Sequence, residues 1–416
     1  MGAGGHGLWR NRAFRRLWAS ETISQTGTRV SMLALPLVAA LVLDASPLQM
    51  GILAGLVNLP ALVVGLFAGV FVDRWRRRWV LVVADLGRAL LLGLVPVAWA
   101  LDLLRIELLF AVTLLTGTFS VFYAVAYRSY LPELVPREQL VEGNSKLEIS
   151  RSAAEIGGPG LAGVLVQLIG APLAVITDAI SFLASAALIG SIRSTERDRE
   201  PVERRAGLLR EAAEGLRLVL GDQLLRSIAG AAATATIFST MLEAVFILYL
   251  TRALDLRPVT IGIVFAAGSV GFLVGALLPE RLTRRFGLGP TLAASLALVG
   301  LGDLLISLAT GPRLVVIGVL IVAEFIFGIG LTVFSINQVS LRQAVTPERL
   351  QGRMNATMLV LVSGATPLAA LLGGIAGELL GLRATLLLAA IGELAAVGWI
   401  ALSPTRQLRT HPESIA

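Results

Sequence analysis

Blocks of about twenty apolar residues, separated by short polar joints, recur along the whole chain. Each block is long enough to cross the hydrocarbon core of a bilayer as an α-helix, which satisfies every backbone hydrogen bond within itself. The pattern predicts an all-α polytopic membrane protein. We expect twelve spans, at residues 16–43, 48–71, 79–101, 107–127, 146–169, 172–192, 224–251, 259–282, 289–310, 313–338, 354–380 and 383–402.

A polar middle segment divides the spans into two sets of six. It predicts an N-terminal bundle at 1–192, a linker at 193–222 and a C-terminal bundle with its tail at 223–416. The charged first part of the linker, 193–205, is typical of a solvated segment. Between Leu209 and Leu220 the apolar residues share one helical face, which predicts an amphipathic helix at the inner membrane interface. The alternative is a connector with no specific role.

Short motifs repeat between the two halves at equivalent inner joints. A parallel repeat of two six-helix halves is typical of one class of secondary transporters. The first motif is Asp73-Arg74-x-x-Arg77-Arg78, which recurs as Glu280-Arg281-x-x-Arg284-Arg285. The second runs from Pro136 to Asn144 and recurs from Pro347 to Asn355.

Composition supports the membrane interpretation, since 56% of the 416 residues are hydrophobic and only 15% are charged. The net charge of +7 arises from arginines between spans, and no basic domain indicates nucleic-acid binding. Basic residues favour the cytoplasmic side of a membrane. With both termini placed inside, the outer loops hold only five of the 35 Lys and Arg residues: Arg105, Arg252, Arg257, Arg313 and Arg383. This bias predicts a protein of the cell membrane whose N- and C-termini are cytoplasmic.

The sequence excludes several kinds of chemistry. It has no Cys, and its only histidines, His6 and His411, lie in the polar tails. We therefore expect no metal site, no cofactor and no enzymatic active site. The single lysine, Lys146, is not part of a phosphate-binding Gly-rich loop, so the chain is not itself an ATP-driven pump.

The segment from Gly65 to Arg78 ends a long apolar run with one acid and four arginines. Its Gly-x-x-x-Asp-Arg-x-x-Arg-Arg spacing resembles the loop between the second and third helices of the major facilitator superfamily. The resemblance implies that Asp73 holds the two halves together on the cytoplasmic side. We expect Asp73 to cap span eleven near Asn355 with Arg128 as its charge partner, and Glu280 to lie against the start of span five. The gating residues so implied are Gly69, Asp73, Arg74, Arg77, Arg78, Arg128, Glu280, Arg281, Arg284 and Arg285.

The fifth span contains Gly158, Pro159 and Gly163, which resemble the Gly-Pro motif in the fifth helix of major facilitator exporters. Proline kinks a helix and glycines admit a close neighbour, although ordinary tight packing is the alternative. Longer segments, such as 11–18, 84–88, 131–136 and 352–355, resemble the drug and siderophore exporter branch, which includes enterobactin and macrolide exporters. The resemblance implies the major facilitator fold, with twelve transmembrane helices in two six-helix bundles.

In that family spans one, four, seven and ten line the central cavity. Polar residues on these spans are therefore candidates for the substrate and proton pathway: Glu21, Gln25, Arg29, Tyr123, Tyr127, Glu243, Glu324, Asn337 and Gln338. We expect Glu243 and Glu324 to bind and release protons, with a structural carboxylate as the alternative. Arg29 is a candidate counter-ion or binds an anionic cargo group. Asp85 and Arg88 are expected to pair locally, whereas Asp178 and Glu393 are expected to be structural.

The implied function is secondary active export of a small amphipathic compound, such as a drug, antibiotic or siderophore, by alternating access and in exchange for protons. The expected partners are the small-molecule substrate, protons and the lipid bilayer, and we expect a monomer that binds no nucleic acid. An importer or facilitator of the same fold is one alternative. A non-transporting membrane scaffold is another, although it would not need Glu243, Glu324 and Arg29 inside the membrane.

Overall fold

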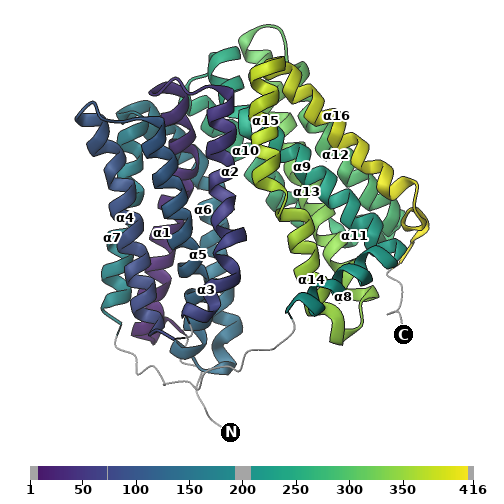
Figure 1. The fold of residues 1–416 in the computed structure, drawn as a ribbon, viewed down its shortest axis with the longest axis horizontal. Helices are drawn as coiled ribbons and strands as arrows, with labels where there is room; N and C mark the ends of the chain where they lie inside the picture. The colour runs from purple at the N-terminus through teal and green to yellow at the C-terminus, as the bar shows by residue number, and fades with distance from the viewer. Residues whose placement is uncertain (1–7, 73, 193–207, 411–416) are drawn as a thin grey trace. The chain divides into compact units, whose positions relative to one another are not determined.

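The computed structural model describes residues 8–72, 74–192 and 208–410, and within these residues it is helical with no strand (Figure 1). The chain divides into two compact units. The first unit comprises Met1–Ala45, Leu56–Glu203 and Arg257–Gly262, and the second comprises Ser46–Gly55, Arg204–Leu256 and Ile263–Ala416. Two short segments therefore differ from the predicted domains: Ser46–Gly55 belongs to the second unit, and Arg257–Gly262 belongs to the first.

The first unit is built mainly from six helices. They are α1 (Arg12–Leu41), α3 (Gly65–Val72), α4 (Arg77–Ala100), α5 (Ile106–Leu134), α6 (Leu140–Ile169) and α7 (Ala171–Gly190), while α2 (Pro47–Val63) is shared between the units. The side chain of Asn11 accepts the amide hydrogens of Ala13 and Phe14, so α1 begins at a capped end. Its amide nitrogen donates to the carbonyl of Leu134 at 3.0 Å, which ties the start of α1 to the end of α5.

Close helix contacts in the first unit rest on small residues. A Cβ at Gly27 on α1 would collide with Asp178 and Ser181 on α7, and one at Gly87 on α4 would collide with the Phe119 ring on α5. Glycine at these positions lets neighbouring helices approach closely, as is common between membrane helices. The packing places the polar side chains of α1, α4, α5 and α7 within reach of one another.

The second unit contains the remaining helices, except for the start of one of them. These helices are α8 (Leu208–Gly221), α9 (Gln223–Leu248) with a π-helical end (Tyr249–Ala253), α10 (Pro258–Ala276), α11 (Pro279–Phe286), α12 (Leu288–Leu308), α13 (Arg313–Val345), α14 (Glu348–Ser363), α15 (Thr366–Leu380) and α16 (Leu382–Ala401). The start of α10, up to Gly262, belongs to the first unit. The Asp222 side chain caps α9 by accepting the amide hydrogen of Leu225 at 2.8 Å. A hydrophobic cluster that includes Leu225, Leu292 and Ile400 forms the core between α9, α12 and α16.

Ten helices in the described part of the chain are long and apolar enough to cross a membrane. The predicted spans one and two are not among them: α1 has 30 residues but a polar composition, and α2 has only 17 residues. Two further predicted spans are interrupted. Pro279 begins α11, and Pro367 lies in the first turn of α15. The preceding helix ends before each proline, because proline has no amide hydrogen with which to continue it.

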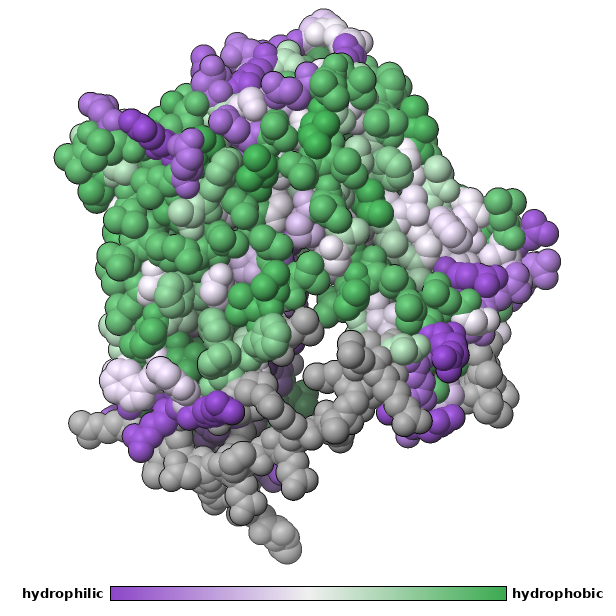
Figure 2. Space-filling model, viewed as in Figure 1, coloured by the Kyte–Doolittle hydropathy of each residue, from purple (hydrophilic) through white to green (hydrophobic). Residues whose placement is uncertain are grey.

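Many large apolar side chains are exposed on the helices, among them Leu90, Leu168 and Leu314. Figure 2 shows hydrophobic side chains over the middle of the helices and hydrophilic side chains toward their ends. Such a broad apolar surface is unfavourable in water and suits the hydrocarbon region of a bilayer.

The predicted amphipathic helix is present as α8, whereas 193–205 lies outside the described residues. Glu214 on α8 forms an ion pair with Arg353 on α14 at 2.6 Å, and a Cβ at Gly215 would collide with Thr357. Leu216 and Leu220 remain exposed on the other side of α8. The helix is therefore docked on α14 within the second unit, with an apolar edge left open.

Candidate functional site

The centre of the polar site in the first unit is Glu21, which is only 7% exposed although it carries a carboxyl group. Its Oε1 accepts a hydrogen bond from the Gln25 amide one turn along α1 at 2.7 Å. Its Oε2 accepts one from the Tyr123 hydroxyl of α5 at 3.0 Å. The two bonds fix the carboxyl group between α1 and α5, so three of the sequence-predicted pathway residues come together.

An arginine on α4 completes this cluster from the opposite side. Arg88 forms an ion pair with Asp85, as the spacing predicted, and this prediction is confirmed. Its guanidinium lies 4.2 Å from the centroid of the Tyr123 ring and 4.0 Å from that of Phe182. A buried arginine stacked between two rings and held by a carboxylate is a fixed positive charge behind Tyr123 and Glu21.

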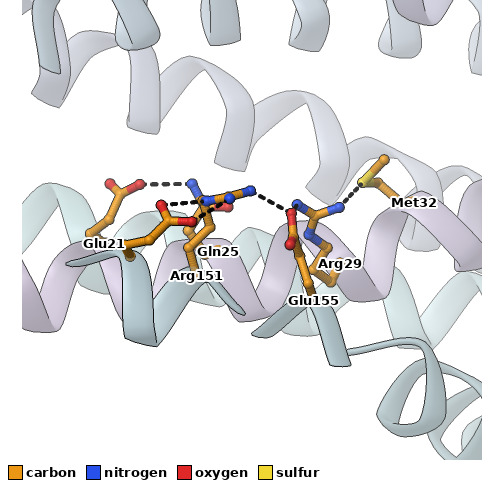
Figure 3. A network of polar contacts seen from close by, with 7 residues as sticks. Glu21, Gln25, Arg29, Met32, Arg151 and Glu155 are labelled. Atoms are coloured by element: carbon orange, nitrogen blue, oxygen red, sulfur yellow. Dashed lines mark hydrogen bonds and ion pairs between the residues drawn. The ribbon is translucent and has the colours of Figure 1, made fainter. Parts of the chain in front are cut away.

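A second polar branch connects α1 with α6 (Figure 3). Arg29 on α1 forms an ion pair with Glu155 on α6 at 2.5 Å, and both side chains are about one quarter to one third exposed. Arg151 contacts the same oxygen of Glu155 at 2.6 Å and also pairs with Glu148. Two acids and two arginines thus balance one another, and Arg29 already has a carboxylate partner.

The two branches meet at a cavity of about 430 Å³ in the first unit. Glu21 and Tyr127 lie on one side, from α1 and α5, and the remaining lining residues come from α6. Tyr127 stacks on Tyr123 with ring centroids 6.0 Å apart, so its ring is held in place. The lining residues are Glu21, Tyr127, Asn144, Ser145, Leu147, Glu148 and Arg151.

The predicted pathway residues of the second unit are more scattered. Glu324 on α13 is half-buried, and a Cβ at Gly268 of α10 would lie 2.8 Å from its Oε2. The Glu243 side chain on α9 is exposed. Its carboxylate interacts electrostatically with that of Glu324. Asn337 is buried and accepts a hydrogen bond from Thr283 of α11 at 2.9 Å.

Gln338, the remaining predicted residue of this group, is half-buried, and its Oε1 has no hydrogen-bond partner in the described part of the chain. Of the four, Glu243 and Glu324 are thus the two that helix packing brings near one another from different helices.

The arginine cluster after α3 divides into two kinds of residue. Arg77 is buried and donates to Glu133 at 2.5 Å and to the Ser129 carbonyl at 2.8 Å, both on α5. Arg78 donates to the carbonyl of Gly190 at the end of α7. Arg74 and Arg128 are exposed, Gly69 is half-buried, and Asp73 lies outside the described residues. Arg77 and Arg78 therefore connect helices of the first unit.

The second copy of this motif lies on the short helix α11 rather than at the end of a long span. Glu280 is in its first turn, and the helix dipole favours an acid there. Glu280 and Arg284 are 4.0 Å apart and largely exposed, as are Arg281 and Arg285.

Gly158, Pro159 and Gly163 lie on α6, which continues as a helix through the proline. A Cβ at Gly158 would collide with the Arg29 side chain, and one at Gly163 would collide with the backbone of Pro258 and Gly262 on α10. Gly158 therefore makes room for the Arg29–Glu155 pair, in addition to any effect on helix packing.

Three residues of this polar network, Glu148, Arg151 and Glu155, were not predicted from the sequence, and neither was Asp303 of the second unit. Glu155 and Arg151 were missed, although their spacing of four, with Glu148 three before Arg151, predicts a set of pairs on one helical face. Asp303 was missed as well, although it is an acid within an apolar span and so meets the criterion applied to Glu324. Within the described residues, no group of three His, Cys, Asp or Glu side chains could hold a metal ion.

The family model described as transmembrane secretion effector, within the major facilitator superfamily, matches residues 3–413 of the chain. The chain belongs to this family. It is 30% identical to the multidrug efflux pump Tap of Mycobacterium tuberculosis strain H37Rv, over 97% of this chain and 96% of the pump. It is 27% identical to the uncharacterized MFS-type transporter YfiS of Bacillus subtilis, over 90% and 88% of the two chains.

A solved structure of a bacterial metal transporter has the same fold, with a TM-score of 0.69 and 19% identity over 94% of this chain and 98% of the other. Membership of the transmembrane secretion effector family makes this chain a multi-pass membrane transporter and not an enzyme. Its relatives among the major facilitators include drug exporters, in agreement with the resemblance found in the sequence.

Proposed function

We propose that this chain exports a small amphipathic compound across the cell membrane in exchange for protons. Twelve helices in two six-helix bundles would expose the binding site to each side in turn, as a monomer with cytoplasmic termini. The observation that carries the proposal is the Glu21 cluster, a buried carboxyl group that borders a cavity inside a unit made of membrane helices. Similarity to an efflux pump over nearly the full chain supports export.

The chemistry of the cavity favours an amphipathic cation as cargo. Glu21 and Glu148 supply carboxylates, and the Tyr127 ring supplies an aromatic face held by Tyr123. An aromatic face and a carboxylate together bind a delocalised cation better than an anion or a neutral sugar. Arg151 is also at this wall, but it is paired with Glu148 and Glu155.

Transport can be tested with ethidium, an amphipathic cation, in inverted vesicles from a host without its own pumps. With the vesicle interior acidified, we expect uptake of the dye, and its loss when the pH gradient is collapsed. Uptake that persists without the gradient would indicate a facilitator. A Glu21→Gln variant should lose uptake, and an exposed-acid variant, Glu107→Gln, is the matched control for loss of one carboxylate.

A resistance panel in the same host identifies the range of cargo. Growth protection against cationic compounds that depends on Glu21 supports export. Increased sensitivity would instead favour an importer of the same fold, and no change with any compound, together with no dye transport, would favour the scaffold alternative.

A further inference from the structure

Two carboxyl groups face each other inside the second unit, away from the pathway residues predicted from the sequence. Asp303 lies on α12 and is 2% exposed, and Glu393 lies on α16 and is fully buried. The helices are brought together beside them, because Gly300 packs against Leu394 with no room for a Cβ. The two carboxyl groups interact directly with each other.

These two acids lack the partners that normally accompany a buried charge. Apart from each other, the Ser239 hydroxyl on α9 acts on Glu393, and no basic side chain of the described residues acts on either acid. In the described part of the chain, no well-formed hydrogen bond reaches either oxygen of Glu393 or Oδ2 of Asp303. Two adjacent carboxylates without a cation cannot both stay ionised in an apolar interior. A proton between them removes one charge and supplies the missing donor.

The buried acids of the first unit have an arginine beside them, unlike Asp303 and Glu393. There Asp85 on α4 and Asp178 on α7 occupy the helices that correspond in order to α12 and α16. Arg88 pairs with Asp85 and its charge also reaches Asp178, while Ser181 donates to Asp178 at 3.0 Å. Arg88 therefore offsets part of the negative charge of the acids in the first unit, whereas no basic side chain of the described residues acts on Asp303 or Glu393.

The pair also has a connection to a residue on another helix. Gly302 packs against the backbone of Ala323, so Asp303 and Glu324 extend from neighbouring positions of α12 and α13. Asp303 is close enough to Glu324 to interact electrostatically, and Glu324 in turn interacts with Glu243 of α9. The acids form a series from buried Glu393 to exposed Glu243.

We propose that Asp303 and Glu393 form a proton-binding site of the second unit and that this site exchanges its proton with Glu324. The inference rests on the proposed proton-coupled export and deepens it, because it places the bound ion. The transported ligand is a proton: from the state in which both carboxyl groups are protonated, one proton leaves the Asp303–Glu393 pair, joins the Glu324 carboxylate and neutralises it, and the pair keeps one proton and one negative charge.

Other charged groups on the elements around this pair are engaged or lie at the helix ends. Arg383, on α16 itself, donates to the carbonyls of Ser307 and Ala309. Glu378 at the end of α15 accepts from the Leu48 amide at 3.4 Å. The remaining groups are Arg226 at the start of α9, Tyr249 and Arg252 at its π-helical end, Glu280, Arg281, Arg284 and Arg285 on α11, Arg313 at the start and Arg342 near the end of α13, and Arg406 beyond α16.

Infrared spectroscopy of the purified full-length protein tests the site without any substrate. A protonated carboxyl group has a C=O stretch distinct from that of a carboxylate, and we expect such a band near neutral pH that weakens as the pH is raised. Asp303→Asn and Glu393→Gln should each remove part of this band, while Glu280→Gln should leave it unchanged. Size-exclusion profiles and unfolding temperatures of the variants establish that they fold.

The wild-type protein keeps the test decisive if a variant does not fold. Isotopic labelling of aspartate carboxyls should shift part of the titrating band, and the shift should persist in Asp85→Asn and Asp178→Asn variants, which lack the buried aspartates of the first unit. Absence of any protonated-carboxyl band, or a band that does not respond to pH, would overturn the proposal. So would a band that survives unchanged in folded variants of both acids.

Ethidium transport separates this proposal from the proposed function. Asp303→Asn vesicles should lose gradient-driven uptake but retain exchange of labelled for unlabelled dye. If the wild type does not transport ethidium although the band titrates, export of such cations is wrong and the proton site stands. If Asp303→Asn and Glu393→Gln both retain gradient-driven uptake, the proton site is wrong and proton-coupled export stands.

Discussion

Arg77 at the start of α4 reaches Glu133 near the end of α5, with 2.5 Å between Nη1 and Oε1. Both residues belong to the first unit, so this arginine of the basic cluster connects two helices of one unit. Arg74, three residues earlier, is exposed. The motif therefore combines a structural arginine with arginines at the surface.

We expect Arg77→Gln to lower the free energy of unfolding by about 3 kcal/mol, because it removes the buried ion pair that joins α4 to Glu133 of α5. Arg74→Gln, the matched control from the same motif, should leave the unfolding temperature unchanged. Thermal unfolding of both variants in detergent checks this expectation. Equal unfolding temperatures would mean that the Arg77–Glu133 pair contributes nothing to stability.

Tyr123→Phe removes the hydroxyl that donates to buried Glu21. Leaving a buried acceptor without its donor costs about 1–3 kcal/mol. We expect a lower unfolding temperature and weaker ethidium transport. Tyr127→Phe keeps the stacked ring and leaves the Tyr123–Glu21 bond intact, so it should change both properties less. The opposite order of effects would argue against Glu21 as the centre of the site.

The Arg29–Glu155 pair can be measured by a double-mutant cycle. Arg29→Gln and Glu155→Gln should each lower stability, and the double variant should lose less than their sum, with a coupling energy of about 0.5–3 kcal/mol. A coupling near zero would show that Arg29 is held by other contacts and is available for an anionic cargo group.

Asp73→Asn tests the gating role that the sequence motif implies. We expect transport to fall while the unfolding temperature stays close to that of the wild type, because an effect on the balance between two states does not require a loss of packing. Normal ethidium transport by this variant would contradict the gating role.

Gly158→Val tests why this position of α6 is glycine. The added side chain would collide with Arg29, so we expect loss of the Arg29–Glu155 contact and reduced stability. Gly157→Val is the matched control, since a Cβ at Gly157 meets no atom within 4 Å. Equal effects of the two substitutions would point to a general effect on helix propensity.

Hydrophobic blocks predicted the helical character of the fold, because the length of an apolar run is set by the thickness of a bilayer. Three predicted spans, 48–71, 259–282 and 354–380, are each divided into two helices, and these breaks were harder to predict than the helices themselves. Pro279 and Pro367 marked two of them, but Val64, between α2 and α3, carries no such signal. The polar α1 also differs from a typical span, because its buried face serves polar contacts rather than lipid.

Single side chains of the site could be found because charge inside an apolar span is unusual. The partners of these side chains could not be predicted in the same way where they lie on another helix, because such contacts depend on how the helices pack. The Asp85–Arg88 pair follows from spacing along one helix, whereas Arg88 stacking on Tyr123 requires α4 and α5 to lie side by side. Likewise, nothing in the local sequence relates Asp303 to Glu393, which is 90 positions later.

The ion pair between Glu214 and Arg353 joins the helix before the seventh predicted span to the second unit. A gene divided ahead of Leu208 would therefore keep α8 together with its docking surface on one polypeptide. Each half would also retain its own hydrophobic cluster, around Tyr130 in one fragment and Leu225 in the other. Co-expression of the two fragments offers a route to attach a reporter at the new ends.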